Sequence, residues 1–222
     1  MVKFKSKKEE TMEKYILKDA EGFNNFNKIK YCGKVLESVR ATNDKMKGFF
    51  VQYVKQDGSK HDFRIYTPAL DIRKLNLVQG NFVMIDGEIH TWNVGQKRVV
   101  VSTFTKDVKI LSEEQYEKDK HFNHGAFVGH IVRKPFIRHR GGETVTESLV
   151  AINDSFRNYS YYIPINCYDD DAQMLKNCCD VGDKIAFEGA LQQRAYPKTL
   201  EDGTVQERTT YEIAVNKLER WR

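Results

Sequence analysis

Several features are scarce in this sequence, and each scarcity excludes a class of protein. No run approaches the length of about 18 apolar residues that a membrane-spanning helix needs. Four prolines are too few for a proline-rich linker. The first ten residues are charged and hold no apolar run, so we expect no signal peptide and a cytoplasmic protein. No C-x-x-C pair occurs, which favours reduced thiols over a metal site at the four cysteines, Cys32, Cys167, Cys178 and Cys179.

Catalytic signatures are missing as well. The chain has no G-x-x-x-x-G-K-[ST] loop, no H-E-x-x-H and no G-x-S-x-G. The one acidic cluster, Asp169 to Asp171, stands where a helix is expected to begin, and negative charge is favourable there. A two-metal nuclease would need carboxylates from separate elements. We therefore expect a protein that is not an enzyme and that holds neither a metal nor a cofactor.

The positive charge is concentrated in one part of the chain. The 222 residues carry a net charge of +5, with 40% hydrophobic and 30% charged residues, which is typical of a globular protein. Lys and Arg exceed Asp and Glu by seven in residues 23–111, whereas residues 122–222 are close to neutral. Because phosphate binding depends on Lys and Arg, the first segment is the candidate for electrostatic contact with nucleic acid.

A long hairpin dominates the second half of the sequence. From Lys184 to Arg194 apolar and polar residues alternate, with Ile185, Phe187 and Leu191 on one side. The pattern returns around Ile213, and the Asp202-Gly203 pair between the two runs is a strong hairpin signal. A hairpin this long and basic, with aromatic residues near its tip, needs a partner strand or a flat anionic ligand such as nucleic acid.

The same plan of strands occurs twice. Strands are predicted at 29–36, 48–55, 60–67, 82–92 and 97–111, with a short helix at 69–74, and again at 125–133, 143–153 and 159–168, followed by a helix at 169–178 and the hairpin. Gly80 and Gly87 keep the spacing of Gly182 and Gly189, and Gly33 matches Gly129. Five strands with a helix between the third and fourth indicate an OB-fold, so we predict an all-β protein of two tandem OB-folds with short helices. One continuous β-sandwich is the alternative. The predicted boundaries are a flexible charged tail (1–22), OB-fold 1 (23–111), a charged helical linker (112–123) and OB-fold 2 (124–222).

Residues 125–221 resemble the bacterial and phage single-stranded DNA-binding protein family. The matching blocks are G-H-I-V-R-K-P-F-I-R, Y-Y-I-P-I-N-C-Y, V-G-D-K-I-A-F-E-G-A-L-Q-Q-R-A-Y and Y-E-I-A-V-N-K-L. The tandem arrangement looks like the two-domain members of some Gram-positive genomes, mobile elements and phages. Residues 28–111 resemble the family only through glycine spacing and strand order.

The resemblance implies a binding site made of stacking platforms and cations. The four aromatic platforms of the family fall on Phe156, Tyr162, Tyr168 and Tyr196, although a small slip in the alignment would replace Tyr162 by Tyr159 or Tyr161. Any one of them alone would more often be a core residue, and the whole set is what favours binding. The basic residues beside them are Lys134, Arg138, Arg157, Arg194 and Lys198. In OB-fold 1 the motif does not single out a platform, and the candidates are Tyr53, Phe63, Tyr66, His90 and above all Trp92.

The expected function is therefore sequence-independent binding of single-stranded DNA in replication, recombination or repair. The alternatives are an adaptor protein of a replication or conjugation complex and a single-stranded RNA binder. The resemblance also implies a homodimer, which would bring four OB-folds together. The sequence stops at Arg222 directly after the last predicted strand, so we expect no acidic C-terminal tail of the kind that recruits repair enzymes.

Overall fold

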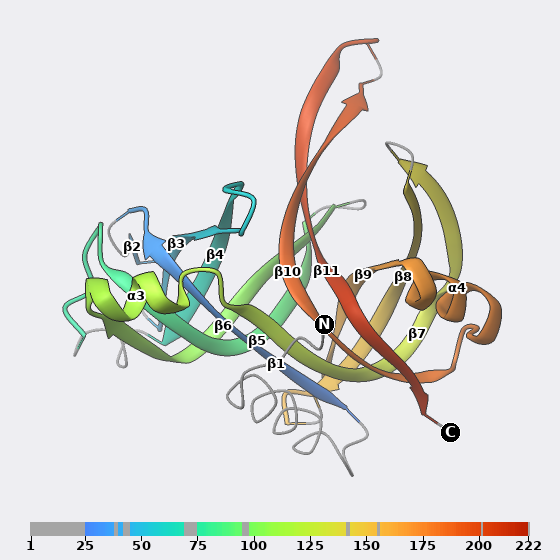
Figure 1. Ribbon diagram of the computed structural model, residues 1–222, viewed down its shortest axis with the longest axis horizontal. Helices are drawn as coiled ribbons and strands as arrows, with labels where there is room; N and C mark the ends of the chain where they lie inside the picture. The colour runs from blue at the N-terminus through green and yellow to red at the C-terminus, as the bar shows by residue number, and fades with distance from the viewer. Residues whose placement is uncertain are drawn as a thin grey trace, which may run out of the picture.

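The computed structural model describes residues 25–37, 40–41, 45–68, 75–94, 98–140, 143–154, 156–200 and 202–221. Strands make up most of it (Figure 1). The first half contains β1 (Phe26–Val35), β2 (Arg40–Ala41), β3 (Met46–Val54), β4 (Lys60–Pro68), β5 (Phe82–Val94) and β6 (Arg98–Leu111). The second half contains β7 (Asn123–Arg140), β8 (Glu143–Asp154), β9 (Tyr159–Tyr168), β10 (Lys184–Thr199) and β11 (Val205–Trp221). The helices among the described residues are α3 (Glu113–Asp119) and α4 (Asp169–Cys178).

Each half closes into a five-stranded barrel. In the second half β7 pairs with β8, β8 with β9, β9 with β11, β11 with β10, and β10 again with β7. The first half repeats this order, from β1 through β3, β4, β6 and β5 back to β1. This is the Greek-key order of an OB-fold, so the prediction of two tandem OB-folds is confirmed. We call β1–β6 the first barrel and β7–β11 the second barrel.

The repeated glycines have a steric reason. At Gly33 an added Cβ atom would lie 2.7 Å from the carbonyl oxygen of Gln52, and at Gly129 it would lie 2.5 Å from that of Ala151. Both glycines therefore let a neighbouring strand of the barrel approach closely. Gly80 and Gly182 have positive φ angles of 91° and 93°, a conformation that costs a residue with a side chain more than it costs glycine.

The two barrels share one sheet. Strands β1 and β7 pair in antiparallel fashion, with Phe26 opposite Val128 and Tyr31 opposite Asn123. The tip of β4 also contacts the β10–β11 hairpin. The Asp62 backbone N–H donates to the side-chain oxygen of Gln193 at 2.7 Å, and the Gln193 backbone N–H donates to Nδ1 of His61 at 2.8 Å. The barrels are therefore joined along a strand and through side chains of the hairpin.

The connector and the hairpin largely follow the predicted pattern. Ser112 caps α3 in a capping box with Gln115, as its place before two glutamates suggested. Strands β10 and β11 run on past the barrel as a long arm (Figure 1). The predicted tail (1–22) and the predicted helix at 69–74 lie outside the described residues. In the described part of the chain, no helix is both long and apolar enough to cross a membrane.

Candidate nucleic-acid interface

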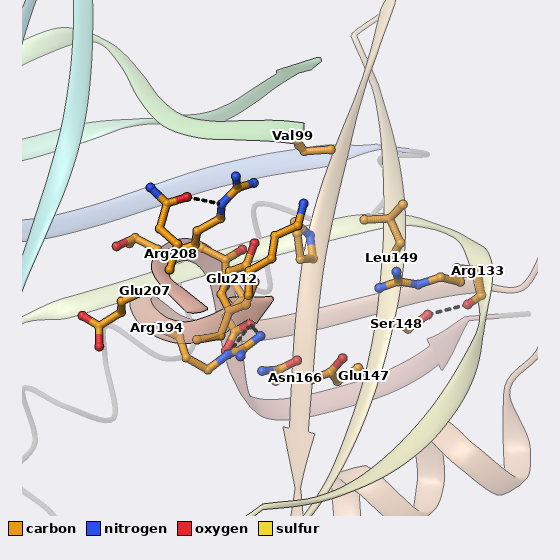
Figure 2. Close-up of a pocket in the computed structure, with 16 residues that line it drawn as sticks. Val99, Arg133, Glu147, Ser148, Leu149, Asn166, Arg194, Glu207, Arg208 and Glu212 are labelled. Carbon is orange, nitrogen blue, oxygen red and sulfur yellow. Dashed lines mark hydrogen bonds and ion pairs between the residues drawn. The ribbon is translucent and has the colours of Figure 1, made fainter. Parts of the chain in front are cut away.

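A cleft of about 630 Å³ opens on the second barrel (Figure 2). Leu149 lies opposite Pro164 and Glu147 opposite Asn166, so alternate residues of β8 and β9 form one side of the cleft. The other side comes from the arm, through Arg194, Tyr196, Lys198, Gln206, Glu207, Arg208, Thr210 and Glu212. The cleft therefore lies between a strand face and a projecting hairpin, with polar and charged groups along the arm.

One of the four predicted platforms lines the cleft, and two others lie on the face of β9 that borders it. Tyr196 lines the cleft directly, and the guanidinium of Arg194 lies over its ring at 5.9 Å from the centroid. Tyr162 and Tyr168 lie on the same face of β9 as Pro164 and Asn166, because side chains alternate between the two faces of a strand. Tyr162 is 43% exposed. The Tyr168 hydroxyl accepts a hydrogen bond from Nε2 of Gln192 at 3.3 Å. The alternation of β9 thus brings both tyrosines to the face that the arm overhangs.

The fourth platform lies at the edge of this region. Phe156 is in the turn between β8 and β9 and is 95% exposed, and none of the described ring contacts involves it. The slip in alignment can be judged from burial. Tyr161 is buried and stacks on His90 of the first barrel, with centroids 4.1 Å apart, so Tyr162 is the residue of this pair that lies on the exposed face of β9.

The predicted arginines are all held by carboxylates. Nε of Arg194 lies 3.0 Å from one oxygen of Glu212, and its Nη2 lies 3.2 Å from the other (Figure 2). Arg138 pairs with Glu147 at 3.2 Å. Sequence reasoning missed these carboxylates, which are buried behind the arginines. In the structure, Gln192 lies opposite Glu212 in the β10–β11 register, and the sequence pattern alone did not indicate this pairing.

Arg157 is positioned in the same way at the other end of β8. Its guanidinium pairs with Asp154 and lies 3.7 Å from Glu88 of the first barrel. Burial raises the pKa of Asp154, but hydrogen bonds from Arg157 outweigh it and leave that pKa below its ordinary value. The hydrogen bond to Asp154 in turn raises the pKa of Arg157, so both groups stay charged. Part of the cationic charge is therefore already neutralised.

The two predicted lysines differ from the arginines. Lys198 is half-buried in the wall of the cleft, and Lys134 is exposed on β7. No ion pair between described residues involves either ammonium group. Arg208 lies beside Lys198 on the arm and donates from Nε to the side-chain oxygen of Gln206 at 3.2 Å. Lys198, Arg208 and Arg133 accordingly line the cleft without a carboxylate partner in the described structure.

Trp92 does not line this cleft. It lies in a separate hollow of about 700 Å³ where the barrels meet, 5.4 Å from the ring of Tyr66. Two other candidates of the first barrel are wrong as platforms, because Tyr53 and Phe63 are buried in the core and stack on each other. Among the described residues, no group of three His, Cys, Asp or Glu side chains is arranged to hold a metal ion.

Comparison with known proteins relates the second barrel to a family. The model of the Single-strand binding protein family matches residues 122–221, which form the barrel with the cleft. This segment of the chain is therefore similar to the family. The fold of the chain is also similar to solved structures of the single-stranded DNA binding protein from Thermus aquaticus. The wild-type protein and a deletion mutant that also carries an Arg-to-Ala substitution both match with a TM-score of 0.67 and 15% identity, over 90% of this chain. The match covers 95% of the wild-type chain and 96% of the mutant chain, so both barrels have a counterpart in overall fold. A search of curated proteins finds no match.

Proposed function

We propose that the chain binds single-stranded DNA without sequence preference, through the cleft of the second barrel. The observation that carries this proposal is a cleft lined by Tyr196, beside the face of β9 that carries Tyr162 and Tyr168, in the segment that matches the family. Flat aromatic faces accept any base, and each stacked base typically contributes about 1–3 kcal/mol. Phe156 extends the row of platforms at the exposed turn.

The phosphates follow the cations along the arm and the rim. Arg208, opposite Tyr196 on the arm, and Lys198 supply charge that no described carboxylate neutralises, and Lys134 lies on the long strand β7. The guanidinium groups are held in fixed positions by carboxylates in Arg138, Arg157 and Arg194, so they contribute little free positive charge for phosphates. Binding in this site therefore depends more on stacking than on counterion release, and it involves no catalysis and no cofactor.

Fluorescence anisotropy of a labelled oligo-dT strand tests the proposal against duplex DNA and oligo-U of equal length. Tight binding of oligo-dT with much weaker duplex binding is the expected result. The double variant Phe156→Ala/Tyr196→Ala should weaken binding by at least about 25-fold, because two stacked bases are lost. The matched variant Tyr196→Phe keeps the ring and should bind like the wild type. Equal affinity for duplex and single strand would contradict the proposal and favour an adaptor role, and tighter binding of oligo-U would favour RNA.

The remaining parts of the proposal concern organisation. The chain divides into a charged tail (1–22), OB-fold 1 (23–111), a linker (112–123) and OB-fold 2 (124–222), and it acts in the cytoplasm during replication, recombination or repair. It assembles as a homodimer, which brings four barrels to one strand. Light scattering at micromolar concentration should give twice the chain mass of 25.9 kDa, and a monomer mass would contradict the dimer.

A further inference from the structure

A second aromatic hollow lies at the junction of the two barrels, and the family match covers only part of it. The first barrel contributes Tyr66 from β4, His90 and Trp92 from β5 and Phe104 from β6. The second barrel contributes Arg157, Tyr159 and Tyr161 from the start of β9 and the turn before it. The hollow exists only because the barrels are docked against each other, and neither barrel alone would form it.

The rings of this hollow are already arranged in a stack. The rings of Phe104 and His90 are 4.8 Å apart and nearly parallel, at 4°. His90 in turn lies 4.1 Å from Tyr161, at 14°. Arg157 covers the Phe104 ring at 5.2 Å from its centroid. Flat groups held at these spacings match the way in which bases stack on aromatic platforms.

Two further rings remain open to a ligand. Tyr159 is 45% exposed and sits 5.1 Å from Tyr161 at the end of the stack, with its hydroxyl bonded to the carbonyl oxygen of Thr91 at 3.2 Å. Trp92 is partly exposed and meets Tyr66 edge to face. A core would not leave such large rings partly in water, so the hollow has unused apolar surface.

The hollow also holds an unsatisfied polar group. Ser102 lines it and is 2% exposed, and its hydroxyl has no hydrogen-bond partner among the described residues. Buried hydroxyls are nearly always hydrogen-bonded in native proteins. This hydroxyl is covered even in the empty hollow, so it does not select the occupant, whereas the flat faces of the rings suit a nucleobase.

The hollow and the cleft of the second barrel are neighbours. Val99 of β6 lines the cleft. It pairs with Asn93 of β5, the residue next to Trp92. The backbone N–H of Tyr162, a platform residue of the cleft, donates to the hydroxyl of Thr91 between His90 and Trp92 at 2.8 Å. A strand that leaves the cleft past Tyr162 therefore reaches the hollow without crossing a barrel.

We propose that this junction hollow is a second base-stacking site, which takes bases of the same DNA strand that occupies the cleft. The inference rests on the proposed function, because it needs a strand in the cleft. It assigns the first barrel a direct contact with DNA, and it assigns Trp92 and Tyr159 the role of platforms. It also makes the docking of the two barrels part of the binding site.

Tryptophan fluorescence tests the junction hollow directly. The chain has two tryptophans, so the variant Trp221→Phe leaves Trp92 as the only one. We titrate this variant with oligo-dT of about 30 nucleotides, long enough to span two OB-folds at about 4–16 nucleotides each. Labelled strand is followed by anisotropy in the same sample. The emission of Trp92 should be quenched as the strand binds.

The two readouts separate the hypotheses. Strand binding without any change in the emission of Trp92 overturns the junction site and leaves the cleft proposal intact. Absence of strand binding overturns both. Photocrosslinking of the wild-type chain to 5-iodo-dU oligonucleotides gives a second test without mutation, and peptides that contain Trp92 or Tyr159 should carry the crosslink. Crosslinks confined to the cleft would contradict the proposal.

Substitutions then measure the contribution of the site. Tyr159→Leu and Trp92→Leu should each weaken binding of the long strand by about 5- to 100-fold. Tyr159→Phe and Trp92→Phe keep a ring and should retain most of the affinity, although Tyr159→Phe loses the bond to Thr91. If the Phe and Leu variants bind equally, the rings do not stack on bases.

Discussion

Replacing Glu212 by Gln tests how the cleft uses its arginines. The Glu212 side chain is 3% exposed, and both of its oxygens bind the guanidinium of Arg194, whose side chain is 30% exposed. Glutamine has nearly the same size and keeps one oxygen as an acceptor. The substitution should therefore leave Arg194 in place beside Tyr196 while its charge is no longer neutralised.

The expected effect is a steeper dependence of affinity on salt. For single strands, log K falls with log [salt] by about 0.7 for each phosphate that a cation neutralises. If Arg194 becomes free to bind one phosphate, the slope should steepen by about 0.7. A tenfold reduction in salt would then strengthen binding by an additional factor of about five. Stability should fall by about 1–3 kcal/mol, less than for a fully buried pair, because water reaches part of Arg194.

The assay is anisotropy of labelled oligo-dT at a series of salt concentrations, for the wild type, Glu212→Gln and a matched variant. The matched variant is Glu207→Gln, which removes a carboxylate from the same cleft at an exposed position on the arm. Its slope should stay within about 0.2 of the wild-type slope. If both variants steepen the slope equally, a general charge effect explains the result. An unchanged slope in Glu212→Gln would refute the idea that the carboxylate masks the arginine.

Two further predictions concern stability. Burial lowers the pKa of His61, whose Nδ1 must stay unprotonated to accept the hydrogen bond from the Gln193 N–H. The stability from this contact should therefore be lost as the pH falls below the unfolded-state pKa of about 6.5. Denaturant unfolding at about pH 7.5 and pH 5.5 should show that His61→Gln loses less stability on acidification than the wild type, and equal losses would contradict this role of His61. Gly33→Ala should destabilise the first barrel by about 1–3 kcal/mol because its Cβ would meet the Gln52 carbonyl, and an unchanged melting temperature in calorimetry would count against this packing.

The sequence predicted the fold well because its signals are local. Alternation along 184–194 and the Asp202-Gly203 turn depend on neighbours in the chain, and the structure has the predicted hairpin there. The glycines at 33 and 129 mark the repeat because each permits one close strand crossing. Such signals need no knowledge of how the barrels are placed in space. The order of the strands then follows from the repeat.

The site was predicted only in part, and the reason is distance along the chain. Parity along β9 brings Tyr162 and Tyr168 to one face, which a period of two can indicate. The partner of Arg194 depends on the register between the two strands of the hairpin, and the pattern of single residues does not fix that register. The carboxylates behind the arginines were missed for this reason.

The junction hollow could not be predicted from the sequence either, because it depends on how the two barrels are placed. His90 and Tyr161 belong to different barrels, and their stacking depends on the pairing of β1 with β7, which sets one barrel against the other. The resemblance to the family placed the platform on Tyr162, with Tyr159 and Tyr161 only as alternatives to it, and Trp92 stands outside the matched segment. Each of these rings, taken alone in the sequence, is best interpreted as a core residue. These rings form a candidate surface for bases only because the fold brings them together from both barrels. On this hypothesis, the tandem arrangement adds a binding site between the barrels as well as a second barrel.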